Sequence, residues 1–144
     1  MLALDPPALI VLPGPISTNN LYFNVPGRGR VITKDYAAWK RRTADMLNAQ
    51  NPLPRFKCAV EITFYVGEIG VGGMDTDNVL KSFTDALKKA GIIHDDSRKW
   101  VRRTGAVWVP GMAGCVARIE TAKADLVADK LRGMIRTGLR GLLS

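Results

Sequence analysis

The sequence contains no long hydrophobic run. Its apolar stretches fall far short of the ~18–20 consecutive residues that a membrane-spanning helix needs. The N-terminal residues MLALDPPALIVLPGP place an aspartate and a proline pair where a signal peptide has a basic start and an unbroken apolar segment. We therefore expect a cytoplasmic protein with no membrane contact.

Cysteine and histidine are nearly absent. The two cysteines, Cys58 and Cys115, lie far apart in strand-like apolar surroundings, with no second cysteine or histidine close to either. This spacing excludes a CxxC zinc site and argues against a disulfide framework, so we expect two buried thiols. The single histidine, His94, adjoins Asp95, but a lone histidine in a turn is more often exposed than catalytic.

Acidic residues are also scarce, since 13 Asp and Glu stand against 21 Lys and Arg, giving a formal net charge of +8. This excess fits a polyanionic partner such as nucleic acid, although a protein can be basic without one. At 144 residues, 47% of them hydrophobic, the chain suits a single core. We expect one domain over residues 1–144.

Hydrophobic periodicity predicts a mixture of strands and helices. Four segments have the pattern of strands, namely residues 9–12, 57–66, 99–109 and 115–120. Apolar residues at helical spacing predict helices over residues 34–48, capped by Thr33, and 78–90, starting at Asp77 and ending at Gly91. The order β-α-β-α-β-β, followed by a C-terminal helix, predicts an α+β fold in which two to three helices pack on a mixed sheet of about four strands.

The C-terminal residues 123–143 repeat apolar side chains at helical spacing, with Arg132, Arg136 and Arg140 one turn apart on another face. Such a helix can bind DNA through its arginines, extend a dimer interface through its leucines, or cover the sheet. Its glycines weaken it by up to ~1 kcal/mol each relative to alanine, so we favour packing.

Half of the ten aspartates fall between Asp75 and Asp96, a segment with a net charge of −2 in this basic chain. Like charges placed together cost free energy unless a cation joins them. Magnesium typically takes one or two carboxylates and leaves other positions to water and phosphate oxygens. Lys81 follows Asp77 by one helical turn and therefore lies on the same helix face. The segment thus predicts a metal site with a lysine beside it.

Distance limits this site. About 13 helical residues carry the chain nearly 20 Å from Asp77, so Asp96 reaches the same site only if the chain reverses sharply at Gly91. A site completed by a partner subunit escapes that limit. The alternative is purely structural: Asp75 and Asp77 cap a helix, Asp85 pairs with Lys81 or Lys88, and Asp95 and Asp96 form a polar turn.

These residues resemble the RusA-type crossover-junction endodeoxyribonucleases, Holliday junction resolvases of bacteria and their prophages. The shared pattern is D-x-D-N-x-x-K, then D-A-L-x-x-A-G, then D-D, found here as Asp75, Asp77, Asn78, Lys81, Asp85, Ala86, Leu87, Ala90, Gly91, Asp95 and Asp96. A second pattern, Pro-x-Ser-x-Asn-Asn, is found at Pro15, Ser17, Asn19 and Asn20. The resemblance covers roughly residues 9–120.

The resemblance implies a bacterial or prophage-encoded homodimer that nicks branched double-stranded DNA, the four-way junction, symmetrically. It implies Mg²⁺ as cofactor, with Mn²⁺ as a substitute, bound by the essential carboxylates of Asp75, Asp77 and Asp96. Lys81 corresponds to the essential lysine, and the role of Asp95 and the number of ions stay open. We also assign DNA contacts to Asn20, Lys81, Arg28 and Arg30, the last two lying in an exposed loop over residues 24–30.

The chain departs from the family in two places. The residues GEIGVGGM precede Asp75, where family members often have a basic run, and residues 122–144 form a helical extension past the family's usual end. Two other functions stay open at this point. One is a non-catalytic basic DNA-binding module, and the other is a metal phosphodiesterase acting on another branched substrate or on RNA.

Overall fold

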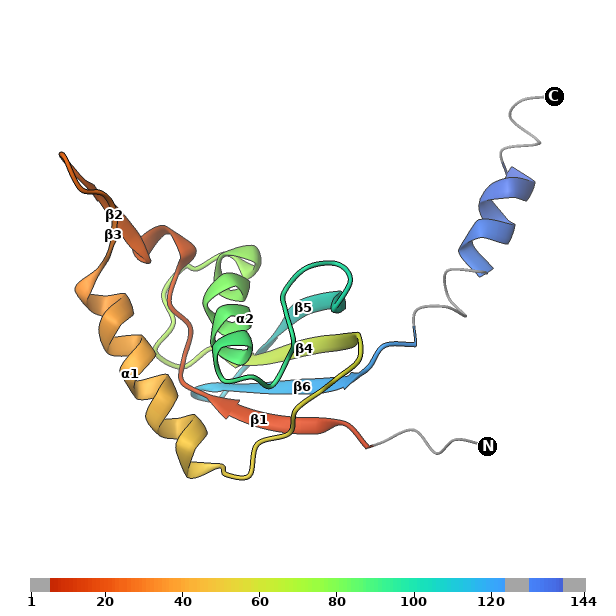
Figure 1. Cartoon of the computed structure of the whole chain (residues 1–144), viewed down its shortest axis with the longest axis horizontal. Helices are drawn as coiled ribbons and strands as arrows, with labels where there is room; N and C mark the ends of the chain where they lie inside the picture. Colours follow the sequence, from red (N-terminus) through yellow and green to blue (C-terminus); the bar gives the residue numbers. More distant parts are fainter. Residues whose placement is uncertain (1–5, 124–129, 139–144) are drawn as a thin grey trace.

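The computed structural model describes residues 6–123 and 130–138 and has the expected α+β fold (Figure 1). Its main sheet has four strands in the order β1-β6-β4-β5. The strands are β1 (Ala8–Leu12), β4 (Val60–Gly67), β5 (Val101–Val109) and β6 (Cys115–Thr121). Strands β4 and β5 are parallel and the other pairs are antiparallel, so the sheet is mixed as predicted.

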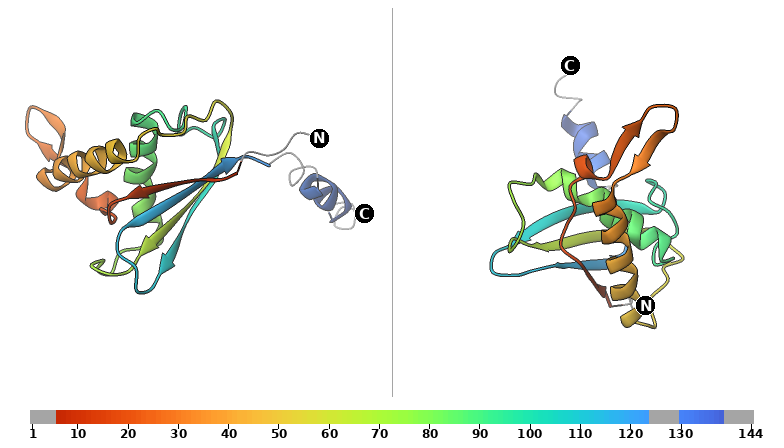
Figure 2. Two further views of the ribbon diagram at one scale, coloured as in Figure 1. Left: turned by 90° about the horizontal axis from the view of Figure 1, so that it is seen from below. Right: turned by 90° about the vertical axis from the view of Figure 1, so that its left-hand side faces the viewer.

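Two helices, α1 (Lys34–Ala49) and α2 (Leu80–Lys89), pack on one face of this sheet (Figure 2). The Thr33 hydroxyl accepts a hydrogen bond from the Tyr36 backbone N–H and caps α1, as predicted. The buried face of α1 is the one that its periodicity predicts, Tyr36, Trp39, Thr43 and Leu47.

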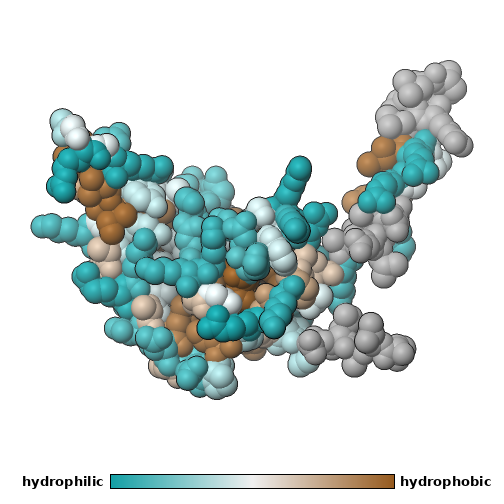
Figure 3. All heavy atoms as spheres, viewed as in Figure 1, coloured by the Kyte–Doolittle hydropathy of each residue, from teal (hydrophilic) through white to brown (hydrophobic). Residues whose placement is uncertain are grey.

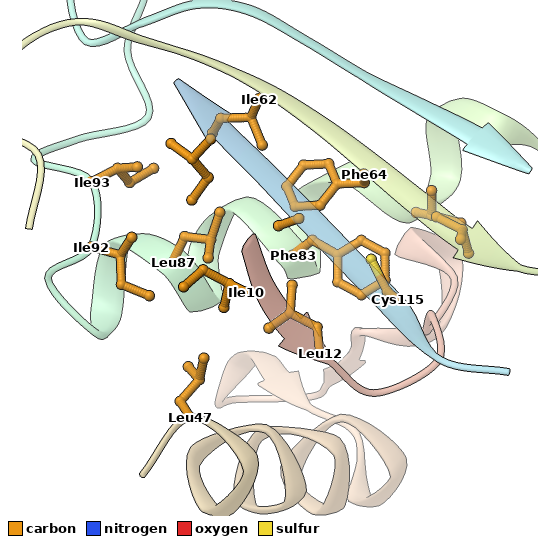
Figure 4. Close-up of a cluster of buried hydrophobic side chains, with 14 of the residues drawn as sticks. Ile10, Leu12, Leu47, Ile62, Phe64, Phe83, Leu87, Ile92, Ile93 and Cys115 are labelled. Atoms are coloured by element: carbon orange, nitrogen blue, oxygen red, sulfur yellow. The ribbon is translucent and has the colours of Figure 1, made fainter. Parts of the chain in front are cut away.

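The core lies between these helices and the sheet. Alternate residues of β4, from Val60 to Val66, are buried against the helices, because successive side chains of a strand point to opposite faces. The ring of Phe83 from α2 stacks on Phe64 of β4 at 5.2 Å between centroids and lies 5.8 Å from the ring of Trp39 (Figure 4). This aromatic contact fixes α2 to the centre of the sheet.

The segment 24–30 is not a plain loop. It lies in a β-hairpin of β2 (Tyr22–Val25) and β3 (Gly29–Ile32), which form a second, two-stranded sheet. The prediction was wrong because the proline and glycines of the turn hide two short strands. The strand predicted from residue 57 begins at Val60, which leaves Cys58 exposed, whereas Cys115 is buried as expected.

Residues 130–138 are helical, and every one of them is exposed. The expected packing of this helix on the sheet is therefore not seen in the single chain, and Arg140 lies outside the described residues. None of the helices in the described residues is long and apolar enough to cross a membrane.

Candidate active site

The aspartate segment follows the loop that leaves β4 at Gly67. Gly67 is needed here, because a Cβ at this position would collide with the backbone carbonyl of Met112. The chain then enters a short 3-10 helix, η2 (Thr76–Val79), and the Trp108 indole N–H of β5 donates to the Thr76 hydroxyl at 3.0 Å. This bond ties η2 to the edge strand of the sheet.

The helix start differs from the prediction. Asp77 lies inside η2 rather than at an N-cap, and Val79 occupies the N-cap of α2. Asp75 is at the N-cap position of η2, but its side chain makes no capping hydrogen bond. Neither carboxylate is therefore used to cap a helix through its side chain.

The N-terminal motif lies beside η2. Thr18, Asn19 and Asn20 form a second 3-10 helix, η1 (Thr18–Asn20), which the Ser17 hydroxyl caps. The Thr18 hydroxyl donates to the backbone carbonyl of Asn78 at 2.8 Å. Two motifs 60 residues apart in the sequence are thereby joined.

The chain reverses sharply after α2, as a site within one chain requires. Gly91 has φ +75°, a conformation that costs other residues free energy, and its N–H donates to the Lys88 carbonyl. The Ile92 N–H donates to the Leu87 carbonyl, and the side chains of Ile92 and Ile93 are buried. Burial of these isoleucines holds the returning chain against the core.

The reversal brings Asp95 and Asp96 to Lys88. The Lys88 ammonium lies 2.9 Å from a carboxylate oxygen of Asp95 and 3.4 Å from one of Asp96. Hydrogen bonds from Lys88, from the Asp96 backbone N–H and from Ser97 hold the pKa of Asp95 well below its usual range. The same carboxylates raise the pKa of Lys88. Asp95 thus connects the returning chain to the last turn of α2.

Asp77 and Asp96 line one cavity of about 450 Å³, although α2 separates them in the sequence. The wall comprises Thr18, Asp77, Asn78, Leu80, Lys81, Thr84, Asp85, Asp96, Val101 and Thr104. The Lys81 ammonium lies 3.3 Å from an Asp85 carboxylate oxygen, so this aspartate holds the lysine on the cavity wall. Three of the four predicted catalytic side chains therefore surround one space.

Asp75 is the exception, since it does not line this cavity. Within residues 6–123 and 130–138, no three His, Cys, Asp or Glu side chains form a group that could hold a metal ion. Two carboxylates and the side-chain oxygen of Asn78 are nevertheless hard donors of the kind that magnesium prefers. Because magnesium usually keeps several waters, the chemical type of these donors is compatible with the ion.

Several residues of the site region had not been predicted. Thr18, Thr84 and Thr104 line the cavity, and the position of Thr18 inside the N-terminal motif was the available signal. Four exposed cations, Arg98, Lys99, Arg102 and Arg103, follow Asp96 directly. His94 is exposed, and its ring lies 4.1 Å from that of Trp100 instead of in the cavity.

A larger cavity of about 740 Å³ lies between α1 and α2 and shares only Asp85 with the first. Its wall includes Tyr36, whose pKa is raised to about 12 by burial and by the nearby charge of Asp85. It includes neither Asp77 nor Asp96. The smaller cavity is therefore the candidate site.

The chain was compared with known proteins. Residues 13–120, more than half of the chain, match the family model described as endodeoxyribonuclease RusA. The matched range contains both motifs and every residue of the smaller cavity. No curated protein matches the chain.

Proposed function

Because this chain belongs to the RusA endodeoxyribonuclease family, we propose that it is a magnesium-dependent endonuclease that resolves four-way DNA junctions by paired phosphodiester hydrolysis. One observation carries the proposal. Asp77, Lys81 and Asp96 line a single cavity. Lys81 lies in the first turn of α2, whereas Asp96 lies in the segment that turns back after α2 ends. Both carboxylates are exposed, so a DNA phosphate can reach them.

In this proposal Asp77 and Asp96 hold the ion, with Asn78 beside them. Bound magnesium would polarise the scissile phosphate and lower the pKa of a water molecule. Lys81 offsets negative charge on the phosphoryl oxygens, and a preorganised cation is most effective where water is partly excluded. Asp85 keeps the Lys81 ammonium in place before DNA arrives, because the two groups form an ion pair.

We also propose a homodimer. Resolving a four-way junction requires paired nicks in opposing strands, and a two-fold arrangement of identical sites supplies them. The position of Asp75 outside the cavity bears on this assembly. Its exposed carboxylate is available to a metal site that two subunits complete, which is the arrangement that the sequence left open.

The DNA-binding surface in this proposal surrounds the cavity. Asn20, Arg28 and Arg30 are exposed on the N-terminal side, as predicted for DNA contacts. Arg98 and Lys99, which follow Asp96 in the sequence, are also exposed and add to this surface, whereas Arg103 pairs with Glu61. Phosphate contacts of this kind position the duplex without reading its sequence.

Cleavage of a synthetic four-way junction, with and without magnesium, tests the proposal. We expect paired nicks near the junction point only when magnesium or manganese is added, and no cleavage of linear duplex. Binding without cleavage in either metal would favour the non-catalytic DNA-binding module. Faster cleavage of flap DNA or RNA than of the junction would favour a different metal phosphodiesterase.

A further inference from the structure

The β2–β3 hairpin projects away from the rest of the domain as an arm (Figures 1 and 2). Its two strands pair with each other from Tyr22–Ile32 to Val25–Gly29 and join no other sheet. Four residues at ~3.4 Å each make the ribbon roughly 14 Å long, which exceeds the ~8.5 Å depth of the DNA major groove. The arm is therefore long enough to enter a DNA groove.

The two faces of the arm differ in chemistry. Paired residues share a face, so Phe23, Val25 and Val31 lie on one side. Phe23 is 49% exposed, and Figure 3 shows an apolar band on the projecting arm. The other side is mixed: it carries Asn24 and Arg30 beside Tyr22 and Ile32, and the Arg30 guanidinium lies 4.1 Å from the centre of the Tyr22 ring. Phe23 together with Val25 and Val31 forms an apolar patch of the kind that often marks an interaction site.

The charge of the arm identifies the kind of partner. Residues 21–33 contain Arg28 at the turn and Arg30 on β3, and no acidic residue. Both arginines are exposed, and neither takes part in an ion pair found in the described residues. A cationic ribbon with an apolar face matches DNA, whose phosphates attract the arginines and whose bases accept aromatic contacts.

The base of the arm is fixed to the candidate active site. Leu21, which begins the arm, is fully buried, and the Thr33 hydroxyl that ends it donates to the Asn20 carbonyl at 2.6 Å. Asn20 belongs to η1, and Thr18 of the same turn holds Asn78 of the cavity wall. The arm is therefore anchored to η1, which lies beside the cavity where the scissile phosphate would bind.

We infer that the β2–β3 arm enters the DNA next to the cut and that Phe23 acts as a wedge, stacking on a base that it displaces from its neighbour. This inference rests on the proposed function and adds a means of holding the junction open. Arg28 and Arg30 contact the flanking phosphates. Apolar wedges of this kind partly unstack base steps in other DNA-binding proteins, and a branch point already interrupts stacking.

The test uses a four-way junction that carries 2-aminopurine beside the branch point, because this base fluoresces more strongly when it is unstacked. The full chain carries Asp96→Asn in every sample so that the junction stays uncut. Phe23→Ala removes the wedge and Phe23→Trp restores an aromatic ring. Ile69→Ala is the matched control, because Ile69 is 58% exposed and lies outside both the arm and the smaller cavity.

We expect binding to raise the fluorescence with the parent chain, with Phe23→Trp and with Ile69→Ala, but not with Phe23→Ala. Loss of one base–aromatic stack should also weaken junction binding about five- to hundredfold. Equal fluorescence and affinity for Phe23→Ala would overturn the wedge while leaving the nuclease proposal intact. Absence of junction binding by every chain would instead overturn the proposed function. If Phe23→Ala turned dimers into monomers by light scattering, the arm would be a protein interface, and the inference would be wrong.

Discussion

At the scale of single residues, the candidate site depends on which aspartates face the cavity. Asp77 and Asp96 line it, Asp85 holds Lys81, Asp95 pairs with Lys88, and Asp75 lies outside. Five carboxylates that look alike in the sequence therefore have different surroundings. An Asp→Asn substitution nearly preserves the shape of the side chain and removes its charge. Because the surroundings differ, its effect on cleavage and stability should differ from one aspartate to the next.

Asp77→Asn should abolish junction cleavage, by at least about a hundredfold, because losing even the hydrogen-bond partner of a metal ligand costs 10–100-fold. Junction binding should stay intact or tighten, since one carboxylate no longer repels the DNA phosphates. Gel-shift binding and cleavage rates measure the two effects separately. Asp45→Asn, an exposed aspartate on α1 outside the cavity, is the matched control and should change neither.

Asp75→Asn should also lose cleavage, as the family resemblance implies. Its carboxylate lies outside the single-chain cavity, so this loss would point to a site that a partner completes. A folded Asp75→Asn protein that cuts at the wild-type rate would remove Asp75 from the ligand set.

At the scale of elements, the chain reversal after α2 decides whether Asp77 and Asp96 of one chain can lie at one site. The turn combines the positive φ of Gly91 with two backbone hydrogen bonds and the burial of Ile92 and Ile93. The apolar side chains supply the free energy that holds the turn, and the glycine permits its shape. The position of Asp96 depends on both.

Gly91→Ala should lower the free energy of unfolding by about 1–2 kcal/mol, the cost of a left-handed backbone for a residue with a Cβ. The added Cβ would also lie 2.5 Å from the Arg55 guanidinium, which is flexible enough to move. Urea unfolding measures the change. Gly14→Ala is the control and should be nearly neutral, because Gly14 has no positive φ and its added Cβ meets no atom within 4 Å. Equal stability of the two variants would contradict this account of the turn.

Asp95 makes the stability of the return depend on pH. In the folded chain the pKa of Asp95 lies below its usual value of 3.8, chiefly because of the hydrogen bond from Lys88. A carboxyl with a depressed folded pKa stabilises the fold at pH values above its unfolded pKa, and the contribution is lost as pH falls below that value. The effect should be small, because the pair is exposed to solvent.

Asp95→Asn should therefore be slightly less stable than the wild type at neutral pH, and the difference should shrink as the pH falls below about 4. Urea unfolding at a series of pH values measures it. A difference that grows towards acid pH would show that the ion pair with Lys88 does not stabilise the turn.

The elements that the sequence predicts well are those with a regular apolar period. The buried face of α1 and the alternation of β4 follow from spacing alone, because each packs one face on the core. The β2–β3 hairpin was not predicted, because its short strands bury few side chains and the turn between them is rich in proline and glycine. Cys58 was predicted to be buried because the apolar run begins before β4 does. The strand starts only at Val60, so Cys58 is exposed.

The sequence predicts candidate site residues but not how they are arranged. The sequence indicates that Asp96 reaches Asp77 only through a reversal at Gly91, and the structure has that reversal. It does not distinguish Asp77 from Asp75, because a 3-10 turn rather than a strand or an α-helix sets their directions. The contact from Thr18 to Asn78 spans 60 residues and has no local signal.

At the scale of the whole molecule, the described chain presents apolar surface that nothing in those residues covers. The open face of the sheet exposes Leu9, Val11 and Val107, and the helix over residues 130–138 exposes Leu131, Met134 and Ile135. Exposed apolar patches of this kind often mark protein interfaces. They are compatible with the homodimer that we propose.

Light scattering should give twice the mass of one chain at micromolar concentration, because an isologous two-fold contact is the simplest way to present two equivalent sites. The complex with a four-way junction should contain two chains. A mass of one chain both free and on DNA would count heavily against the resolvase proposal.

The central claim is that Asp96, returned by the turn at Gly91, acts with Asp77 at one catalytic site. Its most direct test compares two neighbouring substitutions, Asp96→Asn and Asp95→Asn, in magnesium-dependent cleavage of a four-way junction. Asp96 lines the cavity and Asp95 does not. We predict that Asp96→Asn binds the junction but loses cleavage by at least about a hundredfold, whereas Asp95→Asn stays within about tenfold of the wild type. Cleavage at the wild-type rate by a folded Asp96→Asn protein would contradict the claim.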